Sequence, residues 1–180
     1  MDKVYYSVDK AVADVFDGAS VAFGGFFHAG SPVYLIKALA KQGVKNLTII
    51  TQSVAIGNWE INLLVNNHQV KKAICNYPFF RSASRLSPFE QQLRAGEVEC
   101  KVYPMGTFIE KLRAGGAGIA GFYTPTGMGT FVAEGKECRE FDGKDYLLEL
   151  ALKPDFAFVH AYKGDRYGNL VYRKTSRNYN

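Results

Sequence analysis

The 180-residue sequence contains little cysteine and no long hydrophobic run. Its three cysteines, Cys75, Cys100 and Cys138, are widely spaced and form no Cys-x-x-Cys pair, which argues against a disulfide framework and against a zinc or other metal site. Cys75 and Cys100 fall in strand-like runs, where we expect buried thiols. The apolar runs are far shorter than a membrane-spanning helix, and the first residues lack the regions of a signal peptide. A cytoplasmic protein without a membrane partner is therefore expected.

Charge of one sign is not concentrated anywhere in the chain, although Lys and Arg exceed Asp and Glu by 22 to 17. The basic residues are scattered singly, apart from Lys71-Lys72 and Arg173-Lys174, and no basic stripe with stacked aromatics occurs. This pattern argues against a nucleic-acid partner, and the net charge of +5 suits either an anionic ligand or solubility. With 47% apolar and 14% aromatic residues, the chain is expected to fold as one globular domain with a sizeable core.

Residues 17–32 are the stretch around which the rest of the chain is organised. Residues 21–23 predict a buried strand, a loop with three glycines follows, and Ser31-Pro32 then begins an amphipathic helix, with Ser31 as its N-cap. Free N–H groups of the loop and of the helix start would form a concavity suited to a phosphate or carboxylate. The glycine spacing matches neither an NTPase phosphate loop nor a dinucleotide fingerprint. A structural turn and a ligand loop both remain open.

Predicted strands and helices alternate as far as residue 114. Apolar spacing predicts helices at 7–16, 33–39, 58–65, 88–95 and 106–114, and strands at 21–23, 47–51, 70–75 and 98–103. Gly43 and Gly96 are expected to end helices. The alternation predicts an α/β fold, an open and mainly parallel sheet with helices on both faces. No linker or repeat marks a domain boundary, and ligands of such sheets bind beyond the carboxyl ends of the strands.

The last third of the sequence has a different character. Residues 115–118 and 123–130 are so rich in glycine, proline and threonine that they predict an irregular segment, either a functional loop or a well-packed structural one. Beyond it, buried elements are predicted at 146–152, 156–159 and 170–172, with a Gly168-Asn169 turn before the last. Acidic residues in helical or turn contexts are expected to lie on solvated faces, so none is nominated as a catalytic nucleophile: Glu60, Glu110, Glu134 and Glu149.

Several motifs occur together and in one order. They are Asp17-Gly18, Gly24-Gly25-Phe26, Gly30-Ser31-Pro32, the glycine blocks at 113–119 and 122–130, and the C-terminal runs at 140–149, 155–157 and 165–170. This series, which covers almost the whole chain, resembles the alpha subunit of the family I coenzyme A transferases, the 3-oxoacid and acetate CoA-transferases.

The resemblance implies a reaction that moves coenzyme A from one carboxylic acid to another. In the family, a glutamate attacks the acyl-CoA thioester to give an acyl anhydride, and coenzyme A returns to form a glutamyl-CoA thioester. That glutamate belongs to a Ser-Glu-Asn-Gly type motif on the beta subunit, and this sequence has no such motif. A CoA-transferase beta subunit is therefore implied as partner, in a hetero-oligomer such as A2B2, with coenzyme A as substrate and no permanently bound cofactor.

The resemblance also assigns site residues. Phe26 and Phe27 are candidate walls of an acyl or pantetheine channel, and His28 a wall or specificity element rather than a base. The loop associated with coenzyme A comprises Gly24, Gly25, Phe26, Phe27, His28, Ala29 and Gly30. The substrate pocket comprises Met105, Gly106, Gly116, Gly118, Thr124, Thr126 and Gly127.

Three departures from the family pattern matter. Pro104-Met105-Gly106-Thr107 stands where the family commonly has Pro-Gln-Gly-Thr, and methionine cannot donate the hydrogen bond that the glutamine amide is thought to give to the thioester oxygen. Residues 78–88 replace a shorter turn, and Arg81 is a candidate partner for a substrate carboxylate. At residues 177–180 the chains of the family continue, so missing C-terminal elements and an exposed edge are expected. Alternatives are a relative that hydrolyses CoA thioesters or acts on CoA-linked rings, and a non-catalytic subunit that binds an anion or a partner.

Overall fold

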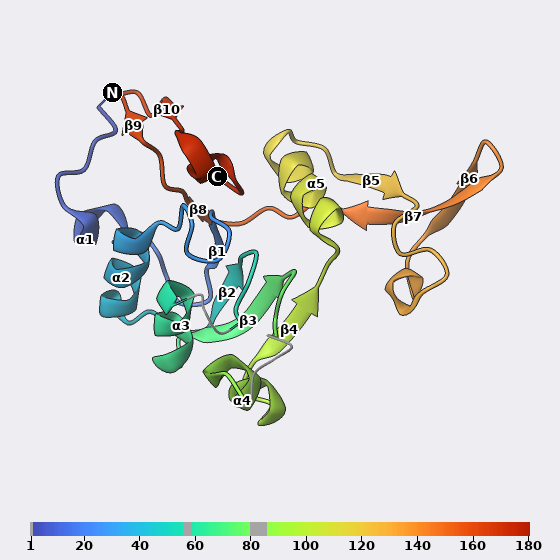
Figure 1. Ribbon diagram of the computed structural model, residues 1–180, viewed down its shortest axis with the longest axis horizontal. Helices are drawn as coiled ribbons and strands as arrows, with labels where there is room; N and C mark the ends of the chain where they lie inside the picture. Colours follow the sequence, from blue (N-terminus) through green and yellow to red (C-terminus); the bar gives the residue numbers. More distant parts are fainter. Residues whose placement is uncertain (1, 56–58, 80–85) are drawn as a thin grey trace. The chain divides into compact units, whose positions relative to one another are not determined.

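A computed structural model describes residues 2–55, 59–79 and 86–180 of the chain (Figure 1). The chain divides into two compact units, the first made of Met1–Val102 and Pro154–Asn180 and the second of Tyr103–Lys153. The chain passes between the two units at residues 102–103 and 153–154, and neither place has a low-complexity linker. The sequence pattern therefore does not reveal the division.

The first unit contains a parallel sheet of five strands in the order β4-β3-β2-β1-β8. The strands are β1 (Ser20–Phe23), β2 (Leu47–Ile50), β3 (Val70–Cys75), β4 (Glu99–Val102) and β8 (Phe156–Phe158). The first four were predicted as strands and β8 only as a buried element, and the predicted open parallel sheet is confirmed. Asp155 secures β8 beside β1, because its carboxylate accepts hydrogen bonds from the amide and the hydroxyl of Ser20, at 2.8 and 2.6 Å.

Four helices accompany this sheet: α1 (Val8–Ala11), α2 (Val33–Gln42), α3 (Trp59–Asn66) and α4 (Pro88–Arg94). The predicted ends of α2 and α4 are confirmed, since Gly43 closes α2 in a left-handed conformation (φ 79°) and Gly96 follows α4 with φ 74°. Helix α1 is shorter than predicted. Ser7 caps it as expected, but the chain turns after Ala11 and buries Val12 and Val15 in the core.

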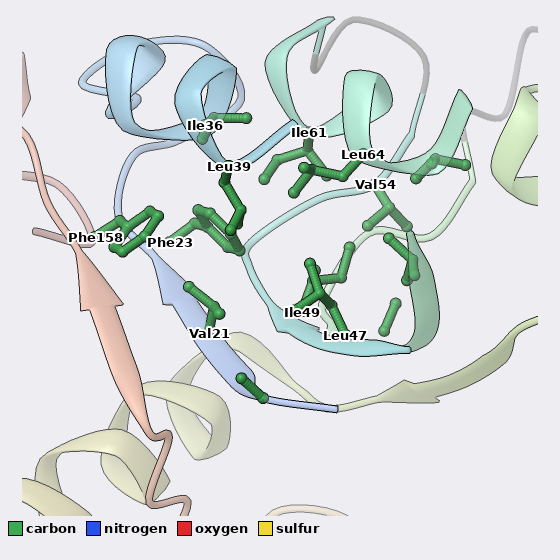
Figure 2. Packing of buried hydrophobic residues seen from close by; sticks show 14 of the residues in the cluster. Val21, Phe23, Ile36, Leu39, Leu47, Ile49, Val54, Ile61, Leu64 and Phe158 are labelled. Carbon is green, nitrogen blue, oxygen red and sulfur yellow. The ribbon is translucent and has the colours of Figure 1, made fainter. Parts of the chain in front are cut away.

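The core lies between one face of the sheet and these helices (Figure 2). Alternate strand residues such as Val21 and Ile49, which are partners in register, meet Leu39 of α2 and Leu64 of α3. Each such side chain contributes about 1.5–3 kcal/mol when it is fully buried. That helices cover both faces of this sheet stays a prediction, because α5, the next α-helix in the described ranges, belongs to the second unit.

The cysteines are free thiols. Cys75 on β3 is buried, and its Sγ lies 4.0 Å from that of Cys100 on β4, which is half-buried. The hydrogen bond with Cys100 and burial both raise the pKa of the Cys75 thiol. The expected burial is therefore confirmed in full for Cys75 and in part for Cys100.

The second unit packs one helix against a three-stranded antiparallel sheet of order β5-β7-β6. Its elements are α5 (Met105–Gly116), β5 (Gly121–Thr124), the 3-10 helix η1 (Phe131–Ala133), β6 (Cys138–Phe141) and β7 (Lys144–Leu150). The prediction of an irregular segment was partly wrong. Gly115 and Gly116 form the last turn of α5, and Tyr123 and Thr124 end β5, where they pair with β7.

The two adjacent helical glycines of α5 differ in their surroundings. A Cβ on Gly115 would overlap the carbonyl oxygen of Leu152, whereas a Cβ on Gly116 would meet nothing within 4 Å. We therefore expect Gly115→Ala to lower the free energy of unfolding by about 1–3 kcal/mol through overpacking. Gly116→Ala is expected to raise it by up to about 1 kcal/mol through helix propensity. Urea unfolding followed by circular dichroism measures both, and equal shifts would show that Gly115 is not packed against Leu152.

After β8 the chain forms a short hairpin of β9 (Lys163–Gly164) and β10 (Leu170–Val171), followed by the 3-10 helix η2 (Lys174–Arg177). The predicted turn is present, with Gly168 at φ 89°. The prediction that residues 170–172 are buried was wrong, because Leu170 is 43% and Val171 58% exposed. Polar bonds within the turn hold this hairpin: Asp165 accepts from Asn169 and from the amide of Tyr167, and these bonds lower the pKa of its carboxyl.

None of the helices in the described ranges combines the length and apolar character needed to cross a bilayer.

Candidate functional site

The loop of residues 24–30 begins where β1 ends, at the carboxyl edge of the sheet. The amide of Gly24 donates to the carbonyl of Phe158 at 2.9 Å, which ties the loop to β8. Phe26 and Ala29 exchange two backbone hydrogen bonds of 2.9 and 3.0 Å, so the loop closes as a tight turn. Phe27 at its tip has φ 51°, which a bulky residue rarely adopts. Surrounding contacts must hold this conformation.

Internal packing explains the three glycines of the loop. A Cβ on Gly24 would overlap Oδ1 of Asn180, and one on Gly30 would lie 2.9 Å from Nδ2 of the same residue. Gly25 has φ 101°, and its Cβ would lie 2.9 Å from the amide nitrogen of Ser31. The glycine content therefore follows from the fold, as the structural-turn interpretation expects. A ligand role for the loop stays a prediction that needs other support.

Gln52, which follows β2, holds the tip of the loop. Its Oε1 accepts a hydrogen bond of 3.2 Å from the amide of Phe27, and its carbonyl accepts from the amides of Asn76 and Tyr77 after β3. The side chain is 1% exposed, and within the described ranges its Nε2 has no hydrogen-bond partner. Gln52 was not among the residues predicted from the sequence. Its position directly after a strand of a parallel sheet is the signal that could have identified it.

Aromatic rings surround the same turn. Phe26 lies 5.4 Å from Phe27 and 6.1 Å from Tyr179 between ring centroids, and Phe27 lies 6.5 Å from Tyr77. Phe26 and His28 are both exposed, so the loop is not sealed inside the fold. This arrangement suits the predicted role of Phe26 and Phe27 as apolar walls.

The start of α2 differs from the prediction that Ser31 is its N-cap. Pro32, whose side chain has no hydrogen-bonding group, occupies the cap position, and the carbonyl of the buried Ser31 accepts the amide of Val33. Proline has no N–H, so Tyr34 and Leu35 are left with the amides that lack an intrahelical partner. The helix start therefore contributes fewer free N–H groups to the predicted concavity than expected.

A pocket of about 280 Å³ opens beside this helix start. Its walls come from residues 31–35 and from residues 159–161, which follow β8. Most of these side chains are apolar, and His160 is the exception that can carry charge. The pocket therefore suits an apolar chain with a polar group at its end more than a bare anion.

In the second unit, Met105 and Gly106 begin α5. Met105 is 40% exposed, and a Cβ on Gly106 would meet nothing within 4 Å. Pro104 offers no side-chain cap, so the first amides of α5 have no partner within the helix. The Gly106 N–H is thus a donor that does not depend on the side chain at position 105.

Among the other predicted pocket residues of this unit, Gly116 lies away from the helix start. Gly116 ends α5, about 16 Å along the helix axis from Met105. Thr124 and Thr126 share one turn, in which the Thr124 hydroxyl accepts from the Thr126 amide at 3.2 Å. Gly118 and Gly127 have φ of 74° and 95°, so backbone conformation accounts for both glycines. The structure thus separates the helix start from the residues at the far end of α5.

Glu149 is buried, contrary to the prediction that it lies on a solvated face. It stands on the central strand β7, is 2% exposed, and forms ion pairs with Lys111 at 2.7 Å and Lys136 at 2.5 Å. Burial would raise the pKa of its carboxyl, but the hydrogen bonds and charges of the two lysines outweigh burial and lower it. The ammonium group of Lys111 lies 4.6 Å above the ring of Tyr103. This cluster therefore anchors the segment that leads into α5.

The other carboxylates named from the sequence lie nearer the surface. Glu134 is exposed, and Glu110 forms a surface ion pair with Arg113 at 2.7 Å, as expected for solvated faces, whereas Glu60 is half-buried. Arg81, the candidate partner for a substrate carboxylate, lies outside the described residues.

Comparisons with known proteins agree with this arrangement. Residues 5–180 match the family described as Coenzyme A transferase. The chain is 43% identical over 180 residues to the alpha subunit of succinyl-CoA:3-ketoacid coenzyme A transferase from Helicobacter pylori, covering all of this chain and 75% of that protein. It is 44% identical over 179 residues to the alpha subunit of 3-oxoadipate CoA-transferase from Acinetobacter baylyi, covering 99% of this chain and 77% of that protein.

Solved structures show the same fold. Glutaconate coenzyme A-transferase from Acidaminococcus fermentans aligns with a TM-score of 0.79 over 96% of this chain and 60% of that chain, at 18% identity. A variant of the decarboxylase AibA/AibB aligns with a TM-score of 0.77 over 94% of this chain and 67% of that chain, at 25% identity.

Proposed function

Because this chain belongs to the coenzyme A transferase family, we propose that residues 1–180 form the alpha-subunit domain of an enzyme that moves coenzyme A between an acyl-CoA and a short-chain carboxylic or 3-oxo acid. The similar subunits are named for succinyl-CoA, 3-ketoacid and 3-oxoadipate, which favours a 3-oxo acid as one substrate. The cytoplasmic location expected from the sequence stays a prediction.

One observation supports our proposal that this chain binds the substrates while a partner subunit supplies the nucleophile. Among the described residues Glu149 is the single carboxylate residue that is almost fully buried, and a lysine holds each of its oxygens. Glu60 is half-buried and has one enclosed oxygen, Oε2, without a hydrogen-bond partner. A carboxylate that is neutralised in this way is a poor nucleophile. Together with the absence of a Ser-Glu-Asn-Gly type motif from this sequence, the pairing of Glu149 supports a partner beta subunit as the source of the attacking glutamate, in a hetero-oligomer such as A2B2. Coenzyme A enters as a substrate, and no permanently bound cofactor is required.

The proposed reaction exchanges one thioester for another. The partner's carboxylate attacks the thioester carbonyl, and coenzyme A leaves as a thiolate, which gives an acyl anhydride. The thiolate then attacks the glutamyl carbonyl, the first acid leaves as a carboxylate, and the acceptor acid reverses both steps. The task of this chain is to bind the substrates and to stabilise the oxyanion that forms at each carbonyl.

Binding is assigned to the loop of residues 24–30 and to the neighbouring pocket. The exposed aromatic edge of Phe26 and the apolar walls beside α2 suit the pantetheine chain or the acyl group. At the start of α5, the Gly106 N–H is the proposed hydrogen-bond donor to the oxyanion, because the Met105 side chain has no hydrogen-bond donor. The turn of Thr124, Thr126 and Gly127 and the glycines 116 and 118 stay further candidates for substrate contact within the second unit.

The test combines this chain with a beta subunit that carries the glutamate motif and follows coenzyme A between two acids. Each thioester is identified by mass spectrometry. We expect a new acyl-CoA to form in equal amount to the one consumed, and only when both subunits are present. Net loss of thioester would instead indicate the hydrolase alternative. Transfer by this chain alone, or no reaction with any matched beta subunit, would overturn the proposal.

Decarboxylation is the second outcome to measure. The structural relative AibA/AibB is a decarboxylase, and Met105 removes the side-chain donor expected for transfer. Release of carbon dioxide from the acyl-CoA of a dicarboxylic acid, whose second carboxylate is still free, without exchange between acids, would favour this activity over transfer.

A further inference from the structure

The segment of residues 178–180, which follows η2, lies on the loop of residues 24–30 and bonds to its backbone. We propose that Asn180, assisted by Asn178, is a positioning residue that fixes the conformation of this loop for substrate binding. The effect of Asn180 on substrate binding rests on the proposed function, whereas its effect on the loop conformation does not.

The hydrogen bonds of Asn180 use both ends of its amide. Nδ2 donates to the carbonyl of Gly30 at 3.2 Å, and Oδ1 accepts the amide of His160 at 2.9 Å. Nδ2 also reaches the carbonyls of Ser176 and Asn178, at 3.1 and 3.0 Å, so the asparagine is held within its own segment. The Asn180 side chain thus connects Gly30, at the end of the loop, to His160, which lies just after β8.

Asn178 and Tyr179 add contacts on either side. Nδ2 of Asn178 donates to the carbonyl of Ala29 at 3.2 Å. Tyr179 places its ring beside Phe26, and its hydroxyl donates to Oδ1 of Asn76 at 3.4 Å. Two successive loop carbonyls, those of Ala29 and Gly30, therefore have partners from this segment. Because carbonyls near a tight turn need partners once water is excluded, these bonds favour the observed conformation.

Shape makes the fit specific. Gly24 has no positive φ that would demand glycine, yet a Cβ there would overlap Oδ1 of Asn180. A Cβ on Gly30 would lie 2.9 Å from Nδ2 of the same side chain. Gly30 also has φ 76°, which by itself favours glycine, so the match of shape to Asn180 is specific to Gly24.

Backbone strain on both sides indicates that the contact is an ordered one. Phe27 in the loop and Tyr179 in the segment are non-glycine residues with φ of 51° and 37°. Such conformations persist only where surrounding contacts outweigh their cost. Gln52 holds Phe27 from one side and Asn180 holds Gly30 from the other. A loop held in this way loses little conformational entropy when a substrate binds.

The first test measures the loop without any substrate. In the full chain, Asn180→Ala is expected to speed amide hydrogen exchange of residues 24–31 about tenfold, as loss of one or two hydrogen bonds predicts. Asn180→Asp keeps the acceptor for His160 but removes the donor to Gly30, and it should show a similar increase. Asn66→Ala, at the exposed end of α3, is the matched control and should leave this exchange unchanged.

The second test measures substrate binding with the beta subunit present. Asn180→Ala should raise the KM for acyl-CoA about tenfold while kcat stays within about twofold, since the loop positions substrate and does not react. Asn178→Ala, which loses only the bond to Ala29, should give a smaller rise. This second variant also serves if Asn180→Ala fails to fold.

The two tests fail separately. Unchanged loop exchange in Asn180→Ala and Asn178→Ala would overturn the positioning role, whatever the kinetics show. Faster exchange with an unchanged KM would overturn the link to substrate binding. If the unmodified subunits transfer no coenzyme A, the proposed function is wrong, and exchange alone then decides whether Asn180 fixes the loop.

Discussion

Glu149→Gln is expected to lower the free energy of unfolding by about 3–5 kcal/mol, because it leaves two lysines without their buried counter-charge. Lys111 is almost as deeply buried as Glu149, with side chains that are 4% and 2% exposed. Glutamine keeps the size of the side chain, so the loss reports charge rather than packing. Urea or thermal unfolding at neutral pH measures it.

Glu110→Gln is the matched control for this substitution. Glu110 pairs with Arg113 on the exposed face of α5, and loss of such a surface pair costs about 0–1 kcal/mol. A loss for Glu149→Gln no greater than for this control would show that the buried charge cluster contributes nothing to stability.

The same cluster predicts a dependence of stability on pH. The lysines lower the pKa of Glu149 in the folded chain below its value of 4.5 in the unfolded chain. Its contribution is therefore complete above that ordinary value and is lost as the pH falls through the lowered pKa of the folded state. The difference in stability between the natural chain and Glu149→Gln should accordingly shrink in acid.

Met105→Gln is expected to raise kcat for coenzyme A transfer about a hundredfold when the variant is combined with the beta subunit, since an added oxyanion donor is worth about a hundred- to a thousandfold. The residue begins α5 and is exposed, so the change disturbs no core contact. The glutamine amide would act beside the Gly106 N–H in the transition state, and KM should therefore change little.

Met105→Leu supplies the control, because leucine has a similar volume and no hydrogen-bond donor. We expect its kcat to stay within about twofold of the natural chain, since volume-conserving apolar changes at an exposed site disturb little. If the glutamine and leucine variants transfer coenzyme A at equal rates, the oxyanion is stabilised elsewhere, and the start of α5 has a different role.

The family and most of the secondary structure of this protein follow from local sequence. Alternating apolar residues mark β1 to β4, Gly43 ends α2, and Ser87 with Glu90 makes the capping box that begins α4. These features depend on residues a few positions apart, and propensity and capping act over that range. The order of the glycine motifs, which identifies the family, is also a linear property.

Tertiary structure alone decided the contacts between distant residues. Asp155 brings β8 beside β1, Lys111 and Lys136 enclose Glu149, and Asn180 rests on Gly24. In each case the sequence alone suggests a solvent-exposed polar residue. Its partner lies far away along the chain, and no sequence spacing connects the two residues. Burial and pairing are properties of the packed molecule, so the charge state of Glu149 and the shape of the glycine loop arise only when the chain has folded.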